Sequence, residues 1–314
     1  MKRYLAIALT AAMGLVYAGS ANALVNSWTN GTVSDYGENA AANGVVASRH
    51  NLGSFGSFIT TTGQNGTTEV CVFCHTPHHT NTSVAPAPLW NRYNATSSYT
   101  PYGTTLGGST ITAVGSVSLA CLSCHDGVTT FDNLVNAPGA GGVVSSGTSQ
   151  GWTFADEGGP GGASSMPTFV TGGGSVSPDE RLNIGTNLSN DHPVSVTYNS
   201  LVASLRPEST TFGSVNLTAG LQGSATTAFG NNLSQNRWAI KGYTVSTASI
   251  SDLLRNNKVE CSSCHDPHFK NTSWDEIEAI GAYAGKDPSE VDGLFLRRVG
   301  GNTGSGVCRT CHNK

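Results

Sequence analysis

The sequence contains few charged residues. Only 11% of its 314 residues are Asp, Glu, Lys or Arg, whereas an average globular domain has about 25%. Lys and Arg together number 16 and form no cluster of the kind that a nucleic-acid-binding surface requires. Gly, Ser, Thr and Asn fill the chain instead, and Gly alone contributes 39 residues. We therefore expect no nucleic-acid partner.

Long apolar runs are absent after residue 23. Residues 1–23 begin with two basic residues, continue as an apolar run and end in Ala-Asn-Ala, which is typical of a signal peptide cleaved after Ala23. A retained anchor is the alternative. We expect an exported chain with no membrane span, in which the loss of Lys2 and Arg3 takes the formal net charge from −4 to −6.

Cysteine occurs only in C-x-x-C pairs, and a histidine directly follows each of the four pairs. C-x-x-C-H is the attachment signature of c-type haem. The two thiols bind the vinyl groups of one porphyrin, and the following imidazole binds the iron from the proximal side. The attaching residues are then Cys71, Cys74, Cys121, Cys124, Cys261, Cys264, Cys308 and Cys311, and the proximal ligands are His75, His125, His265 and His312.

Four disulfides or two zinc sites are the other arrangements open to eight cysteines in an exported chain. Neither of them requires a histidine after every pair, as this sequence has. The expected cofactors are therefore four haem c groups.

The ligand on the far side of each iron decides what a haem can do. Met166 is the single methionine after residue 23, so at most one iron could have a methionine ligand. Five histidines lie outside the motifs, namely His50, His78, His79, His192 and His268. They suffice to give every iron a second imidazole, with one histidine to spare.

An internal repeat divides these histidines between two halves of the chain. Residues 71–83 (CVFCHTPHHTNTS) and 261–273 (CSSCHDPHFKNTS) share the pattern C-x-x-C-H-x-P-H-x-x-N-T-S, and each has one histidine upstream and one further motif downstream. This indicates two di-haem units in tandem. The expected distal ligands are His50, His78, His192 and His268.

His79 aligns with Phe269 and is left over. It is a surface histidine, a substitute for His78, or a ligand to a haem in a neighbouring molecule. For the pairing of ligands and haems, we expect His78 on the second haem and His268 on the fourth. His50 and His192 then complete the first and third haems.

The chain divides into four expected parts: a signal peptide (1–23), an N-terminal arm with the first di-haem unit (24–131), a Gly/Ser/Thr-rich intervening segment with short strands (132–248) and the second di-haem unit (249–314). The expected fold class is a multihaem c-type cytochrome, mostly coil, with a few short helices and short β-strands around four covalently bound haems. We expect helices at 249–257 and 272–285. Strands are expected within 194–198 and 238–245.

Some charged residues lie close to the motifs. Asp126 and Asp266 directly follow proximal histidines and are either hydrogen-bond partners that tune the iron or solvated carboxylates near the haem edge. Arg297, Arg298 and Arg309 surround the fourth motif. They are either partners of haem propionates or ordinary surface residues.

Three classes of function compete. An electron carrier or conduit needs only bound and spaced haems, whereas a multihaem reductase of nitrogen or sulfur oxyanions needs an open iron and a cationic pocket. Haem storage is the third class. The surplus of histidine and the scarcity of Lys and Arg favour electron transfer by four bis-histidine haems over enzyme activity.

The motifs carry a resemblance to a known family. Four C-x-x-C-H motifs in tandem pairs, a signal peptide and a Gly/Ser/Thr/Asn-rich body resemble the OmcE-type tetrahaem outer-surface cytochromes. The resemblance covers residues 50–79, 121–126, 192–195 and 261–312 by motif, and the rest of the chain by composition. It implies bis-histidine irons and an extracellular filament of identical subunits with a continuous chain of haems.

The resemblance also implies that one histidine can be donated across the subunit boundary, a role that would fall on His50 or His79. The expected partners are identical subunits, redox partner cytochromes and an extracellular electron acceptor, and the expected location is the cell surface or beyond it. A monomeric tetrahaem shuttle in the periplasm is the alternative.

Overall fold

The computed structural model describes residues 45, 48–53, 59–62, 67, 69–83, 89–95, 97–103, 106, 109–137, 142–143, 153–156, 183–217, 236–271, 293–302 and 305–313. All eight cysteines and all nine histidines lie within these ranges. The expected signal peptide and the helix expected at 272–285 lie outside them.

Helices in the described residues are short, and each C-x-x-C-H motif lies on one of them or on a 3-10 turn. The α-helices are α2 (Ser116–His125), α4 (Ile250–Leu253), α5 (Cys261–Cys264) and α7 (Gly306–Cys311). The 3-10 turns span Cys71–Phe73, Phe212–Ser214 and Gly293–Phe295.

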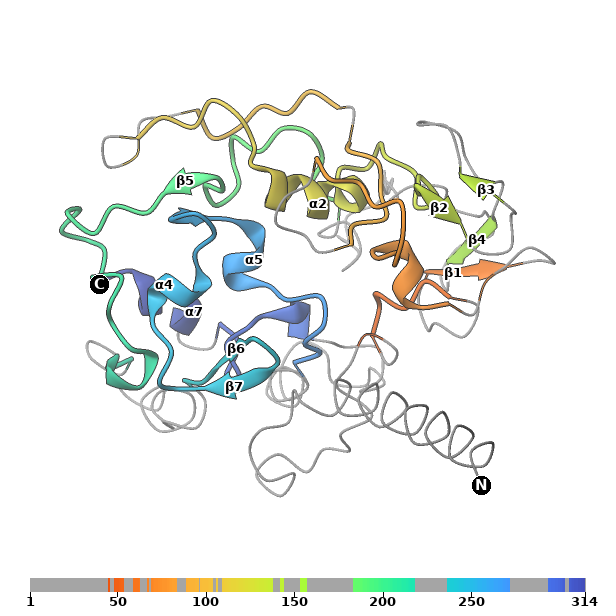
Figure 1. Cartoon of the computed structure of the whole chain (residues 1–314). Coiled ribbons are helices and arrows are strands. Elements are labelled where there is room, and N and C mark those ends of the chain that lie inside the picture. The colour runs from red at the N-terminus through yellow and green to blue at the C-terminus, as the bar shows by residue number, and fades with distance from the viewer. Residues whose placement is uncertain are drawn as a thin grey trace, which may run out of the picture.

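The described strands form antiparallel pairs of two to four residues. The pairs are β1 (Ile59–Thr62) with β4 (Thr153–Asp156), β2 (Asn136–Ala137) with β3 (Gly142–Val143), β5 (Val196–Thr197) with β8 (Lys258–Val259), and β6 (Trp238–Ile240) with β7 (Tyr243–Val245). In Figure 1, β1 to β4 lie on one side of the molecule, and α4, α5, α7, β6 and β7 gather on the other.

Both alternating segments expected to form strands do so. Residues 194–198 contain β5, and residues 238–245 form the hairpin of β6 and β7. The hairpin turns at Lys241 and Gly242, whose φ angles are 49° and 87°. Positive φ at both central residues gives the turn twist that suits a two-residue hairpin.

The helix expected at 249–257 is shorter than predicted. Ser249 caps α4, and its backbone N–H donates to Asp252 at 2.8 Å in a capping box. The helix then ends at Leu253, because Asn256 and Asn257 adopt positive φ angles of 51° and 60° and turn the chain back. Asn tolerates this left-handed conformation better than most residues.

The best-defined apolar cluster belongs to the second unit. Tyr198, Phe212, Trp238, Ile240, Ile250 and Leu253 are buried together. The partly buried Cys311 of the fourth motif packs against this cluster. The cluster therefore fixes the position of α7, which carries that motif.

The two ends of the intervening segment belong to the units beside them. Leu134 pairs with Arg92 of the first unit, and Trp238 pairs with Arg298 of the second. Strand β6 is also held by the N–H of Ala239, which donates to the carbonyl of Arg297 at 2.8 Å. The described ends of the segment therefore pack on the two haem units.

Candidate haem-binding sites

Helical backbone aims the proximal histidines. In three motifs the histidine N–H donates to the carbonyl of the first cysteine: His75 to Cys71 at 2.8 Å, His265 to Cys261 at 3.0 Å and His312 to Cys308 at 2.8 Å. In the second motif, His125 is the last residue of α2. One helical turn thus brings both thiols and the imidazole of a motif to the same side of the chain.

The tautomer of one proximal histidine is fixed by the backbone. Nδ1 of His265 lies 2.6 Å from the carbonyl oxygen of Leu294. A carbonyl only accepts hydrogen bonds, so Nδ1 donates and Nε2 of the neutral ring is left free to bind a metal. This is the arrangement that an iron-ligating histidine requires.

His50 lies opposite the second motif. Its ring centroid is 6.2 Å from that of His125, with the planes nearly perpendicular at 89°. Burial, and next the nearby His125, lower the pKa of His50 to about 3, so this imidazole is neutral. Its Nδ1 is buried and has no hydrogen-bond partner among the described residues. The backbone of Pro267 forms a hydrogen bond with the ring, so the nitrogen left without a partner is Nδ1 and not the Nε2 that is free in His265.

His268 lies opposite the first motif in the same way. Its ring centroid is 5.9 Å from that of His75, and the planes are 17° apart. Trp90 stands beside this pair, with its ring centroid 6.0 Å from that of His75. Trp90 is buried.

Both separations match two imidazoles bound to one metal. A metal–imidazole bond is about 2 Å long, and the ring centre lies about 1 Å behind the nitrogen, so two rings on opposite sides of one iron have centroids about 6 Å apart. His50 with His125 and His75 with His268 satisfy this relation. The residues present therefore fit the cofactor at the first and second motifs.

These contacts favour a different pairing from the expected one. We expected His50 on the first haem, His78 on the second and His268 on the fourth. The structure instead brings His268 to the first motif and His50 to the second. The reason is that the two halves pack across each other, so that a spare histidine of the second half faces a proximal histidine of the first.

The other three spare histidines are exposed. His78, His79 and His192 lie at the surface, and no ring contact given by the described residues joins them to a proximal histidine. Nδ1 of His192 is 3.0 Å from the carbonyl oxygen of Pro193. His79 adopts a positive φ of 52°.

The internal repeat extends beyond the residues that align in sequence. His75 pairs with Trp90, and His265 pairs with Leu296, each in an antiparallel bridge. The next residue, Asn91 or Arg297, donates its N–H to the second cysteine of the motif at 2.8 Å in both halves. The two bridged residues are 15 positions apart in the first half (75 to 90) and 31 in the second (265 to 296). This difference hides the repeat from sequence comparison.

One asparagine closes each copy of this repeat. The side-chain amide of Asn81 donates to the carbonyl of Arg92 at 2.8 Å. Its counterpart Asn271 donates to the carbonyls of Arg298 at 2.7 Å and Leu296 at 2.9 Å. The asparagine of the repeated pattern thus has a structural role that the sequence did not reveal.

Two buried arginines occupy equivalent places in the repeat. The guanidinium of Arg92 donates to the hydroxyl of Ser123 at 2.9 Å and to its carbonyl at 2.6 Å, which ties the first motif to α2. That of Arg298 lies against Gly306 at the start of α7, where an added Cβ would come within 2.4 Å of it. Each half therefore uses a buried arginine to join its two motifs. Sequence reasoning missed Arg92 altogether.

Two of the three arginines around the fourth motif, Arg297 and Arg298, are buried, so neither is an ordinary surface residue. Arg297 donates to backbone carbonyls, among them Ala239 at 2.6 Å, and Arg298 donates to Gly301 at 2.6 Å. The guanidinium of Arg309 donates to the carbonyl of Leu217. These hydrogen bonds join segments of the chain.

A buried carboxylate joins the two halves. Glu260 precedes the third motif and accepts hydrogen bonds from the hydroxyls of Ser118, which lies on α2, and of Ser195, the latter at 3.0 Å. Ser118 also accepts the N–H of Cys261 at 3.1 Å. Helices α2 and α5 are thereby packed together, which brings the second and third motifs side by side.

The thiols of successive motifs are neighbours. Burial, followed by Cys124, raises the pKa of the Cys74 thiol to about 12, and burial, followed by Cys311, raises that of Cys264 to about 12. Cys121 donates a hydrogen bond to Cys261, which raises the pKa of Cys121 and lowers that of Cys261. Each motif therefore has a thiol near a thiol of the next motif along the chain. None of the eight cysteines forms a disulfide.

Both aspartates that follow proximal histidines are buried, so the expectation of solvated carboxylates is wrong. Asp126 is held within its own loop, where it accepts from the N–H of Thr129 at 2.7 Å and the hydroxyl of Tyr99 at 2.9 Å. Burial raises its pKa, but these hydrogen bonds outweigh burial and the pKa is lowered. Asp266 instead contacts a spare histidine, His268.

Compared with known proteins, the chain matches no family model and shows no significant match to a curated protein. Across the described ranges, none of the helices has the length and apolar character needed to cross a bilayer. In the same ranges, no three His, Cys, Asp or Glu side chains are grouped so that they could hold a bare metal ion.

Proposed function

We propose that this protein binds four c-type haems, each iron held between two histidines, and that it transfers electrons. The observation that carries the proposal is the pair of imidazole separations, 6.2 Å between His50 and His125 and 5.9 Å between His75 and His268. Each pair joins a histidine of a C-x-x-C-H motif to one outside the motifs. Two such pairs at the spacing of axial ligands support bis-histidine sites.

Each bound haem would supply a one-electron couple between ferric and ferrous iron. The chain's own residues determine how that couple is used. The cysteine thiols would anchor the group permanently, and the paired imidazoles would hold its iron and exclude substrates from it. Contacts between the thiols of successive motifs favour a path that follows the order of the motifs along the chain.

The third and fourth motifs need the remaining spare histidines. With His50 and His268 used, the histidines that remain are His78, His79 and His192, and all three lie at the surface. We assign the two remaining distal positions to His192 and His78, because the internal repeat leaves His79 without a counterpart. His79 is left as an extra ligand or as a ligand to a neighbouring subunit. A surface histidine can reach a haem from outside the subunit, which is compatible with an assembly of identical chains.

A filament of identical subunits outside the cell is the form in which we propose that the protein works. The resemblance to the OmcE-type cytochromes implies it, and the low content of charged residues, 11%, favours close contact between subunits. A head-to-tail interface that does not close into a ring produces a fibre. The acceptor would be a distant extracellular oxidant.

A reductase is the less favoured alternative. Oxyanion substrates need cationic side chains that point into a pocket, but Arg92, Arg297 and Arg298 are buried and donate to groups of the chain itself. Electron transfer between bound haems requires no cationic pocket of this kind.

The experiment that tests the proposal is a haem count with a ligand-binding assay. We expect the mature protein to contain four covalently bound haems per chain by pyridine haemochrome analysis and intact mass. The reduced protein should not bind carbon monoxide, because both axial positions are taken. Fewer than four haems, or ready binding of carbon monoxide, would overturn the proposal.

A further inference from the structure

The carboxylate of Asp266 is aimed at a spare histidine. Its Oδ1 lies 3.1 Å from Nδ1 of His268 and also accepts the backbone N–H of His268 at 3.0 Å. An ionised carboxylate only accepts hydrogen bonds, so Nδ1 of His268 is the donor. This bond occupies Nδ1 and leaves Nε2 as the nitrogen available to a metal.

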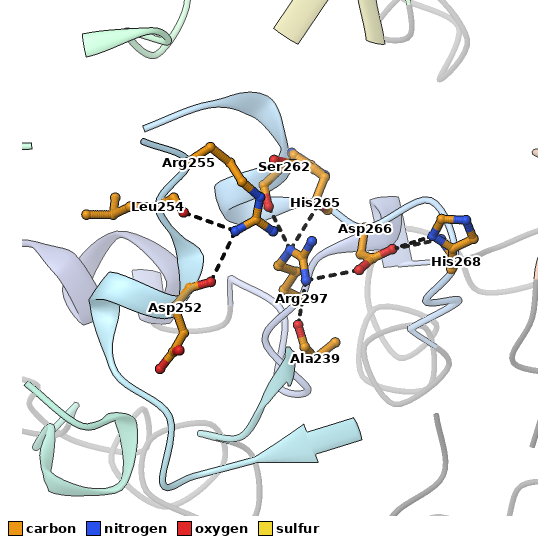
Figure 2. Close-up of polar contacts among 9 residues, drawn as sticks. All are labelled: Ala239, Asp252, Leu254, Arg255, Ser262, His265, Asp266, His268 and Arg297. Atoms are coloured by element: carbon orange, nitrogen blue, oxygen red, sulfur yellow. Dashed lines mark hydrogen bonds and ion pairs between the residues drawn. The ribbon is translucent and has the colours of Figure 1, made fainter. Parts of the chain in front are cut away.

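A buried arginine holds the other oxygen of this carboxylate. NH1 of Arg297 lies 2.9 Å from Oδ2 of Asp266, and the same guanidinium donates to the backbone carbonyls of Ala239 and Ser262 at 2.6 and 2.7 Å. Figure 2 shows Arg297 between these groups, with Asp266 bridging it to His268. The carboxylate cannot turn without breaking this set of bonds.

The partners of Asp266 agree with this role. One carboxylate oxygen is paired with the buried guanidinium of Arg297 at 2.9 Å, and the other lies 3.1 Å from Nδ1 of His268. The carboxylate is thus shared between a fixed cation and an imidazole N–H.

We propose that Asp266 is a positioning residue, which orients His268 as an iron ligand of the first motif and lowers the reduction potential of that haem. The inference rests on the proposed function. A carboxylate that accepts the second N–H of a ligating imidazole fixes the orientation of the ring and makes it a stronger electron donor. A stronger donor stabilises ferric over ferrous iron.

The position of Asp266 joins two sites. It directly follows His265, the proximal residue of the third motif, and its side chain acts on His268, which faces His75 of the first motif. The same short segment thus supplies one ligand to each of two sites and sets the electronic character of one of them. The first haem would be tuned by the second half of the chain.

Asp126 provides a matched control. It also directly follows a proximal histidine, and it is also buried. Its carboxylate, however, accepts from Val128, Thr129, Tyr99 and Ser97, which are not ligands. Asp126→Asn therefore removes a negative charge beside a proximal histidine without changing a hydrogen bond to any expected iron ligand.

The test compares the full haem-loaded protein with its Asp266→Asn and Asp126→Asn variants. Asn can still accept the N–H of His268, so D266N should keep four low-spin haems. In an electrode-driven titration, in which each iron takes up one electron, we expect one of the four reduction steps of D266N to move to higher potential. The low-spin EPR g values of one haem should change with it, because the imidazole has become a weaker donor. D266E, which restores the charge, should bring both back towards the parent values.

D126N should leave the g values of every haem unchanged, whatever its effect on the potentials. The inference is overturned if D266N has the g values and reduction steps of the parent, or differs from the parent no more than D126N does. That outcome, in a protein with four low-spin haems, leaves the proposed function intact. A parent protein that lacks four haems would instead contradict the proposed function itself.

Discussion

His50 and His268 each face a histidine that follows a C-x-x-C pair, and each pair of rings has the separation expected for ligands of one iron. At the scale of single residues, these two contacts have the most direct consequences. They identify the histidine that would complete each of two sites, and each of these histidines can be replaced separately.

Replacing either histidine should open one iron. In His50→Ala, we expect the haem of the second motif to become high-spin, and in His268→Ala the haem of the first motif. EPR spectra of the oxidised variants should each show a high-spin ferric signal equivalent to one haem per chain. The His79→Ala variant is the control: His79 is exposed, and its loss should leave the isolated subunit low-spin. A low-spin H50A would show that another residue holds that position.

The residue types of the sites can be predicted from the sequence, but their pairing cannot. Covalent attachment requires both cysteines and the proximal histidine within five residues, so the sequence displays them. A distal histidine has no such constraint, because it reaches its iron through the path of the whole chain. His268 was therefore expected at the fourth haem, although it lies beside the first motif.

At the scale of elements, the structure repeats a unit in which a motif turn pairs with a short extended segment. Asn81 and Asn271 hold equivalent segments in place. Only Asn271 is buried, at 1% exposure. This difference makes the two positions a matched pair for measuring what the repeated contact contributes.

Removing the buried asparagine should cost more than removing its half-buried counterpart. In Asn271→Ala, the carbonyls of Leu296 and Arg298 lose their partner away from water, which should lower the free energy of unfolding by about 2–4 kcal/mol. In Asn81→Ala, water can replace the lost donor, so the loss should be about 1 kcal/mol. Urea denaturation followed by visible circular dichroism measures both. Equal losses would argue against the difference in burial as the cause.

Short elements could be predicted where local chemistry decides. The Ser249 cap and the alternation in 238–245 gave the start of α4 and the hairpin of β6 and β7. The end of α4 depends on two asparagines that adopt positive φ, and a sequence pattern does not require this. Arg92 was missed because a single arginine in a polar stretch carries no sign of burial, yet it ties the first motif to α2.

At the scale of the whole molecule, the motifs form a series, because the thiols of each motif lie near those of the next. Glu260 joins the two halves at the middle of this series. A chain of sites that runs through a subunit suits an assembly in which subunits are joined end to end.

The prediction at the scale of the whole molecule concerns the assembly of subunits. Negative-stain microscopy of the purified mature protein should show filaments. If His79 is a ligand to the neighbouring subunit, His79→Ala should give shorter filaments or dispersed particles without loss of haem. Dispersed particles at every concentration of the parent protein would favour the periplasmic shuttle over the filament.

The central claim is that two imidazoles occupy the axial positions of every iron. The most direct measurement is a quantitative EPR spectrum of the fully oxidised protein, with the haem content determined on the same sample. The account predicts low-spin ferric signals that integrate to four haems per chain, with no high-spin component. A high-spin signal equivalent to one haem or more would contradict it.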